Sequence, residues 1–220
     1  TINKDEYIFD FSFPKELGHP NPHLWLNPQY AIRYAALVRD EVVRLDAKNR
    51  DAYEHNATQF IQKAEALDQA IQAATQTIPP NNRRLLTYHD SWPYFARRYG
   101  FRVIGAVQPS DFTDPSPREV MRLIDQIRRE KVPAVFGSEV FPSPVLEQIA
   151  REAKSQYIDK LRDDELPAKP GEPRHSYIGM MLDNVTIMFE ALGGSSESLK
   201  TVDPAPIAGA HADYRRKTTL

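Results

Sequence analysis

The feature that most constrains this chain is a long amphipathic segment, residues 48 to 78. Its apolar side chains recur at alternating spacings of three and four, with charged residues between them, which is typical of a helix with one buried stripe. We expect Asp46 to cap this helix, and Pro79 with Pro80 to end it, because proline lacks the backbone donor. At about 1.5 Å per residue the helix would be roughly 45 Å long, so it should run along a protein rather than inside a small one. The apolar positions are Tyr53, Ala57, Phe60, Ala64, Leu67, Ile71, Ala74 and Ile78.

After Pro80 the pattern changes to short apolar runs that alternate with helical segments. The runs cover residues 85–88, 103–107, 134–136 and 157–158. The expected helices cover residues 91–99, 117–130, 144–153 and 175–192, with Gly100 closing the first of them. Strands that alternate with helices predict a parallel sheet with right-handed crossovers. The predicted fold class is therefore α/β, and residues 195–220 are expected to form a loose tail.

The 220 residues contain no cysteine, so disulfides, thiolate metal sites and cysteine nucleophiles are excluded. Any metal must then bind to histidine or carboxylate side chains. The net charge of −2 and a pI near 6.3, with dispersed basic residues, give no electrostatic case for nucleic acid. No apolar run reaches the length of a membrane span. This composition fits a cytosolic or an exported protein.

Candidate metal ligands follow the predicted strands. His89 follows the first strand, Glu139 the third and Asp159 the fourth. Because the carboxyl ends of parallel strands converge at one edge, these side chains form a plausible cage for zinc or manganese. Any α/β domain places polar residues at strand ends, however, so an ordinary surface role stays open.

His23 favours the metal interpretation, because proline and apolar neighbours hold it rigidly at the mouth of a helix. Asn27 is expected to cap that helix and Pro28 to occupy its first turn. The alternative is a histidine that caps the helix or packs under Trp25. Surface or capping roles are expected for the other histidines, which are His19, His55, His175 and His211.

Six segments resemble known sequence motifs and occur in the same order along the chain. Residues 21–28 read Asn-Pro-His-Leu-Trp-Leu-Asn-Pro, close to an Asp-Pro-His-x-Trp-Leu-Asp-Pro signature, and residues 89–100 read His-Asp-Ser-Trp-Pro-Tyr-Phe-Ala-Arg-Arg-Tyr-Gly. The others lie at residues 51–56, 115–118, 135–139 and 176–184. Together they resemble the zinc/manganese solute-binding proteins of ABC importers, the ZnuA/TroA-like family, from about residue 20 to 192. Two departures stand out: Asn21 and Asn27 replace the commoner aspartates, and the loop 161–174 is longer than usual.

The resemblance implies that His23, His89 and Asp159 bind zinc, or manganese, in a cleft between two lobes. We expect Glu139 to orient an imidazole by accepting its second N–H. The resemblance also implies a division of the chain into four parts. These are residues 1–47, the end of an N-terminal lobe; 48–78, the interlobe helix; 79–194, a C-terminal α/β lobe; and 195–220, the tail. The first ligand histidine of the family would precede Thr1, so the chain is expected to be a fragment.

The predicted function is capture of a divalent transition metal outside the cytoplasm, in the periplasm or as a lipid-anchored protein, and delivery to the permease of an ABC importer. No catalysis is expected. Two alternatives stay open: a metal-dependent hydrolase with Glu139 as general base, and an adhesin-like structural lobe. If the first lobe is absent, Phe60, Leu67 and Ile71 should be partly uncovered. The chain should then form a dimer or associate with the missing lobe.

Overall fold

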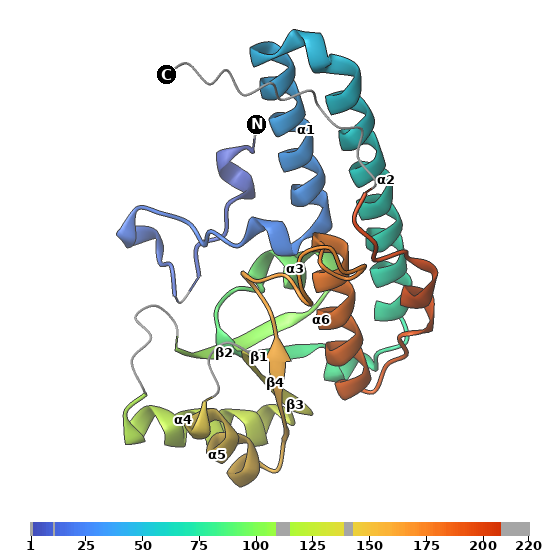
Figure 1. Ribbon diagram of the computed structural model, residues 1–220. Helices are drawn as coiled ribbons and strands as arrows, with labels where there is room; N and C mark the ends of the chain where they lie inside the picture. The colour runs from blue at the N-terminus through green and yellow to red at the C-terminus, as the bar shows by residue number, and fades with distance from the viewer. Residues whose placement is uncertain (1, 11, 109–114, 139–142, 208–220) are drawn as a thin grey trace.

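The long amphipathic segment folds into one helix, α2 (Arg50–Thr75), which lies antiparallel to α1 (Pro28–Leu45) and projects with it from the rest of the molecule (Figure 1). The computed structural model describes residues 2–10, 12–108, 115–138 and 143–207. With 26 residues, α2 is about 39 Å long. All of its buried residues lie between Ala64 and Thr75, so only its second half enters the core.

The expected helix begins two residues too early and ends three residues too late, and Asp46 does not cap it. Residues Ala47–Asn49 form a separate 3-10 turn, and the cap position of α2 is Asn49. The carboxylate of Asp46 instead accepts hydrogen bonds from the Tyr53 hydroxyl at 2.9 Å and from Asn49 Nδ2 at 2.7 Å. Asp46 therefore braces the turn between the two helices.

The predicted parallel sheet is confirmed. Its strands are β1 (Arg84–His89), β2 (Arg102–Gln108), β3 (Ala134–Ser138) and β4 (Gln156–Leu161). They lie in the order β2-β1-β3-β4, and each neighbouring pair is parallel. The two middle strands are almost wholly buried, as expected for a sheet covered on both faces.

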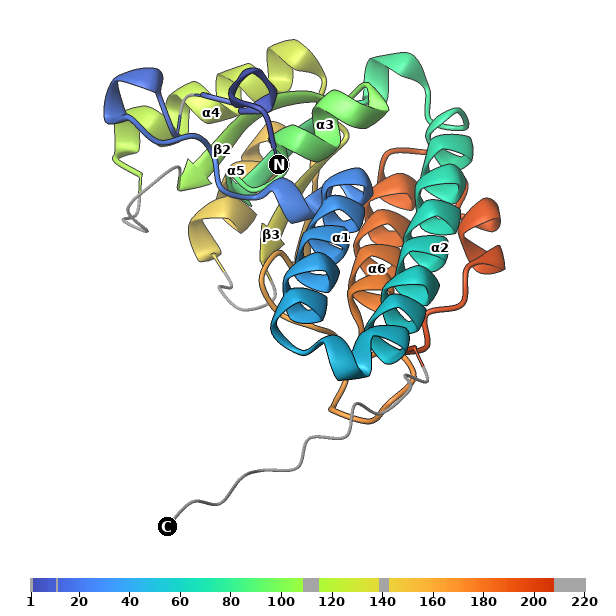
Figure 2. The same cartoon turned by 90° about the horizontal axis from the view of Figure 1, so that it is seen from above.

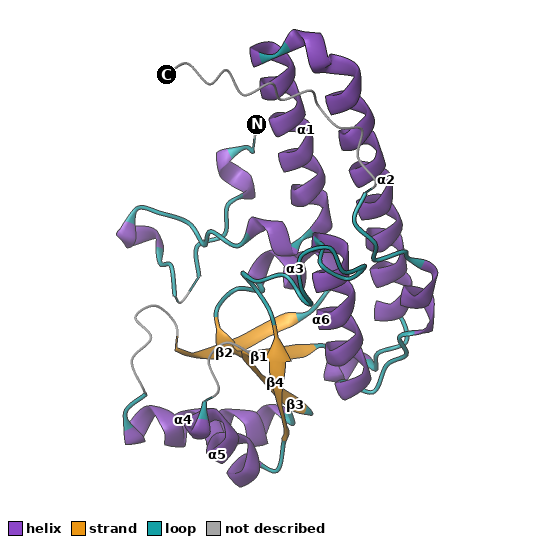
Figure 3. Cartoon of the chain, in the orientation of Figure 1, coloured by secondary structure: helices purple, strands orange, loops and turns teal. Residues whose placement is uncertain are grey.

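Four further helices cover the sheet, with α3 and α6 on one side and α4 and α5 on the other (Figure 3). Their bounds are α3 (Pro93–Tyr99), α4 (Pro117–Glu130), α5 (Pro144–Ala153) and α6 (Tyr177–Ala191). Gly100 closes α3 with a φ of 74°, a left-handed conformation that glycine adopts without strain, as the sequence predicts. Viewed from above, α6 lies beside α2 (Figure 2). The larger hydrophobic core therefore lies between the sheet and this helical layer.

The apolar stripe of α2 is not left uncovered. Leu67 and Ile71 are fully buried, and Phe60 packs against the ring of Tyr177 with 5.8 Å between centroids. The expectation of a partly uncovered stripe is therefore wrong for Leu67 and Ile71, whereas Phe60 is half-buried, and the stripe gives little reason for a dimer through α2. The large exposed apolar side chains of this hairpin lie on α1 instead, where Val38 is 62% and Leu45 69% exposed.

The expected loose tail is partly ordered. Residues Glu197–Thr201 form a 3-10 helix, and Leu199 and Val202 are buried. The Ser198 hydroxyl donates to the backbone oxygen of Ala70 at 3.0 Å, which fixes this segment on α2. Residues 208–220 lie outside the described part of the chain. Within the described part, no helix combines the length and apolar character that a membrane crossing requires.

Candidate metal centre

His23 lies in a closed aromatic pocket just before the short 3-10 helix Leu24–Leu26. It is 4% exposed, and its ring lies 5.2 Å from the ring of Trp25 and 6.4 Å from that of Phe13. Its side chain makes no capping hydrogen bond to that helix. Asn27 caps α1 through its side chain, and Pro28 is the first residue of α1, as the sequence predicts. The rigid segment before α1 therefore presents His23 from a fixed position.

His89 is the last residue of β1, and its ring meets that of His23. The two Nε2 atoms lie 3.1 Å apart, and the rings meet edge to face with 4.8 Å between centroids. Two nitrogens on one tetrahedral zinc ion would lie about 3.3 Å apart, because Zn–N bonds measure about 2.0–2.1 Å. The spacing between the two histidines therefore already approximates that of two ligands on one ion.

The surroundings of His23 keep its imidazole neutral. Burial, with a smaller contribution from the positive charge that His89 can carry, lowers the pKa of His23 from 6.5 to about 3. A neutral imidazole retains the lone pair that a metal ion needs, and it does not compete with the metal through a bound proton. His23 is therefore ready to bind a metal throughout the physiological pH range.

Asn21 connects His23 to the first residues of the chain and to the strand end that carries His89. Its Oδ1 accepts from the backbone N–H of His23 at 3.0 Å and lies 2.9 Å from His23 Nδ1. Its Nδ2 donates to Asp10 Oδ2 at 3.1 Å and to the backbone oxygen of Asp90 at 2.8 Å. Asp90 is fully buried, and burial, with the charge of Asp10 adding to it, raises its pKa to about 7.

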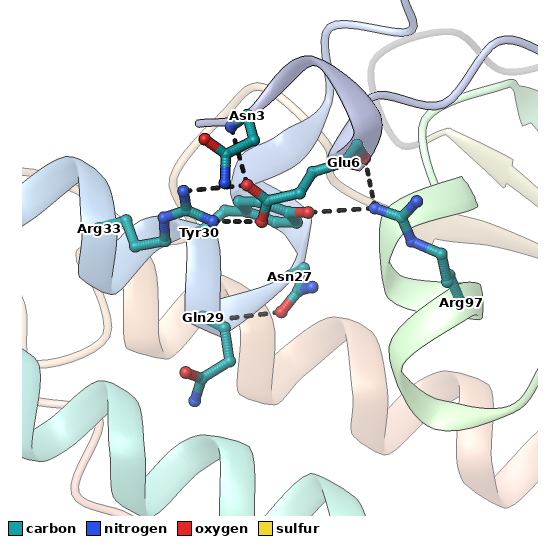
Figure 4. Close-up of polar contacts among 7 residues, drawn as sticks. All are labelled: Asn3, Glu6, Asn27, Gln29, Tyr30, Arg33 and Arg97. Carbon is teal, nitrogen blue, oxygen red and sulfur yellow. Dashed lines mark hydrogen bonds and ion pairs between the residues drawn. The ribbon is translucent and has the colours of Figure 1, made fainter. Parts of the chain in front are cut away.

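Polar contacts around Glu6 hold the residues before His23 against α1 and α3 (Figure 4). The Glu6 carboxylate pairs with the Arg33 guanidinium of α1, and this ion pair lowers the pKa of Glu6 to about 2. Arg97 of α3 donates to the backbone oxygen of Glu6 at 2.5 Å and to the Tyr30 hydroxyl at 3.0 Å. The segment that carries His23 is therefore fastened to the helix that follows His89.

Asp159 does not lie where the sequence places it. It is expected after the fourth strand, but β4 continues to Leu161, so Asp159 lies inside the strand and is exposed. The register between β3 and β4 shifts here: Phe136 faces Ile158, whereas Ser138 faces Leu161. The extra residue is a β-bulge, which sequence patterns do not reveal. The structure therefore brings together His23 and His89 but not Asp159.

A second acidic residue, Asp163, lies at the carboxyl end of the sheet near His89. Asp163 and His89 both line a small cavity at the carboxyl end of the sheet, together with Phe136 and Leu161. The indole N–H of Trp25 donates to the backbone oxygen of Asp163 at 2.8 Å, which holds this residue at the site. Asp163 was not a candidate from the sequence, because the apolar run at residues 157–158 suggests a strand that ends five residues before it.

Glu139 lies outside the described residues. Among the residues that are described, no group of three or more histidine, aspartate or glutamate side chains converges as a metal site requires. The described part of the site is thus a pair of imidazoles with carboxylates nearby, a donor set that fits a borderline divalent ion such as zinc.

Comparison with known proteins shows which family the chain resembles. The profile described as "ZnuA: Zinc-uptake complex component A periplasmic" matches residues 4–191. The metal ABC transporter substrate-binding lipoprotein FimA of Streptococcus parasanguinis is 28% identical over 177 residues, which cover 80% of this chain and 57% of that protein. The iron-binding protein YfeA of Yersinia pestis is 30% identical over 176 residues, covering 80% and 56%. The chain thus spans little more than half the length of these relatives.

Solved structures show the same fold. The periplasmic zinc-binding protein TroA from Treponema pallidum superposes with a TM-score of 0.77 at 24% identity, covering 88% of this chain and 69% of that one. A Mn-bound periplasmic metal-binding protein from Candidatus Liberibacter asiaticus gives 0.69 at 25% identity, covering 79% and 64%.

Proposed function

The chain belongs to the ZnuA family, and on that premise we propose that it acts outside the cytoplasm as a receptor for a divalent transition metal. The metal is bound between His23 and His89 and passed to the permease of an ABC importer. Relatives named as substrate-binding lipoproteins of metal ABC transporters support this role and the location, in the periplasm or at a lipid anchor. Their names describe binding and transport rather than catalysis, which favours a receptor over a hydrolase.

The observation that carries the proposal is the approach of the two Nε2 atoms to 3.1 Å. The two histidines come from segments 66 residues apart, and both are positioned by hydrogen bonds or strand pairing rather than by chance surface contact. Two ring nitrogens at this distance can share one proton, or they can both donate lone pairs to one cation. A metal ion between them satisfies both nitrogens.

Zinc is the metal that the described donors favour, with manganese as the alternative. Imidazole nitrogens suit zinc and iron, whereas manganese prefers a shell richer in oxygen. The relatives are named for zinc, manganese and iron alike, so the family does not choose among these ions. The two imidazoles therefore support the proposed preference for zinc over manganese.

A carboxylate should complete the site. We assign this role to Asp159 because the family resemblance implies it, and Asp163 is the alternative because it lines a cavity with His89. In the first case β4 must rearrange around its bulge when the metal binds. In the second case the strand stays as it is. Glu139 is proposed to orient one of the imidazoles.

Calorimetric titration with Zn²⁺ and Mn²⁺ tests the proposal. His23→Ala and His89→Ala should each reduce Zn²⁺ affinity at least about 100-fold, because each removes one of few ligands. His55→Ala is the matched control: His55 is exposed on α2, where its ring contacts Gln59, and its loss should leave affinity unchanged. Unchanged affinity in both site variants would refute the assignment.

A further inference from the structure

We propose that Asn21 is a positioning residue that holds the proton of His23 on Nδ1 and so directs the lone pair of Nε2 toward His89. The side chain does not touch the metal; it acts through His23. This inference rests on the proposed function only for the identity of the ligand, since the tautomer of His23 is a property of the metal-free chain.

The first step of the argument is the orientation of the Asn21 amide. Its Nδ2 faces two acceptors, Asp10 Oδ2 at 3.1 Å and the backbone oxygen of Asp90 at 2.8 Å. Its Oδ1 faces the backbone N–H of His23 at 3.0 Å. A flipped amide would place oxygen against two oxygens and NH₂ against an N–H. Three independent partners therefore fix which end of the amide faces His23.

The second step is the tautomer. An amide oxygen can only accept, so the ring nitrogen at 2.9 Å from it, His23 Nδ1, must carry a proton. In a neutral imidazole the other nitrogen is then the one with the lone pair. That nitrogen, Nε2, is the one 3.1 Å from His89. Asn21 thus makes the site-facing nitrogen of His23 the metal-binding one.

The third step explains why an amide serves at this position better than an aspartate would. A carboxylate at residue 21 would keep the acceptor for His23 but would lose both donated hydrogen bonds. It would also set a negative charge beside Asp10 and the buried Asp90. An amide supplies the acceptor without this charge. The residue type at position 21 is therefore matched to Asp10 and Asp90 in this chain.

Long-range ¹H–¹⁵N NMR on the metal-free chain at neutral pH tests the tautomer directly. The wild-type spectrum should show His23 protonated at Nδ1, and Asn21→Ala should shift it toward a mixture with Nε2–H. Asn21→Asp should keep the Nδ1–H tautomer, because its carboxylate still accepts. Asn82→Ala is the matched control, since it also removes a hydrogen-bonded amide, one that donates to the backbone oxygen of Leu192 and precedes the end of β1 opposite His89. A wild-type His23 protonated at Nε2 would overturn the proposal even if no variant folds.

Zn²⁺ titration of the same proteins gives a second readout. Asn21→Ala should weaken Zn²⁺ binding by about 10- to 100-fold, the usual effect of losing a group that orients a ligand histidine, whereas Asn82→Ala should not. Wild type that shows the Nδ1–H tautomer but binds no metal would refute the proposed function and leave the positioning role standing. Unchanged tautomer and unchanged affinity in Asn21→Ala would refute the positioning role alone.

Discussion

The Tyr94 hydroxyl donates to the backbone oxygen of Asn21 at 2.9 Å and accepts from the backbone N–H of Ile8 at 3.1 Å. Tyr94 lies on α3, the helix that follows His89, and Asn21 lies two residues before His23. One buried phenol therefore ties the two histidine-bearing segments together. The spacing of the proposed ligands depends on this contact as much as on the histidines themselves.

Replacing Tyr94 by phenylalanine should loosen this connection. We expect a loss of about 1–2 kcal/mol in unfolding free energy, because a buried carbonyl and a buried N–H lose their partner. Zn²⁺ affinity should fall several-fold as well. Tyr157→Phe, on the α5 side of the sheet, is the control: it can lower stability but should leave affinity unchanged. Urea denaturation and calorimetry measure both effects, and an unchanged affinity in Tyr94→Phe would contradict the connection.

The pH dependence of stability should reflect two buried groups with opposite signs. The pKa of His23 falls from 6.5 to about 3, so the folded chain binds fewer protons and this contribution to stability rises with pH across that range. The pKa of Asp90 rises from 3.8 to about 7, so the folded chain binds more protons and this contribution falls with pH. In metal-free wild type the two contributions should largely cancel.

Variants that each remove one of the two titrating groups should separate the contributions of His23 and Asp90 to the pH dependence of stability. In Asp90→Asn, stability should drop by about 2 kcal/mol between about pH 7.5 and pH 5, because only His23 remains. In His23→Gln, stability should increase by about the same amount over that range, because only Asp90 remains. Denaturant titrations at several pH values measure these slopes. Equal slopes in both variants would contradict the assigned shifts.

Asp68 links the three helices nearest the site, so its loss should be costly. Its carboxylate pairs with Arg98 and accepts from the Tyr99 hydroxyl at 2.6 Å and from Gln29 Nε2 at 3.0 Å. Asp68→Asn should lower unfolding free energy by about 2–4 kcal/mol, somewhat less than for a fully buried pair. Asp203→Asn breaks the more exposed pair with Lys63 and should cost less than about 1 kcal/mol. A similar loss of unfolding free energy in both variants would contradict the larger contribution assigned to the hydrogen bonds and ion pair of Asp68.

The identity of the acidic ligand can be decided by comparing Asp159→Asn with Asp163→Asn. If Asp159 binds the metal, its variant should lose affinity about 10- to 100-fold and zinc should change the exchange rates of amides around the β4 bulge. If Asp163 binds, the affinity loss should move to that variant and β4 should not respond. Isothermal titration and hydrogen exchange measure the two effects. Loss in neither variant would exclude both residues.

Much of the fold was predictable from periodicity. Local spacing predicts the succession of strands and helices along the chain, including α2. The caps at Asn27 and Gly100 follow from residues with few conformational options. These features depend on local chemistry, which a sequence displays directly. The approach of His23 to His89 was instead implied by the family resemblance, since 66 residues separate the two.

The parts that escaped prediction depend on tertiary contacts. The β4 bulge that moves Asp159 exists only because β3 and β4 pair with a shifted register. Asp46 lost its expected capping role because Tyr53 competes for its carboxylate. The ordering of Leu199 and Val202 depends on a site on α2 that their own sequence does not reveal.

The central claim is that His23 and His89 bind one metal ion together. X-ray absorption spectroscopy at the zinc edge of the loaded chain tests it most directly. The account predicts imidazole nitrogens at about 2.0–2.1 Å, with one imidazole fewer in His23→Ala and one fewer in His89→Ala. A zinc shell whose imidazole count is the same in wild type and in both variants would contradict it.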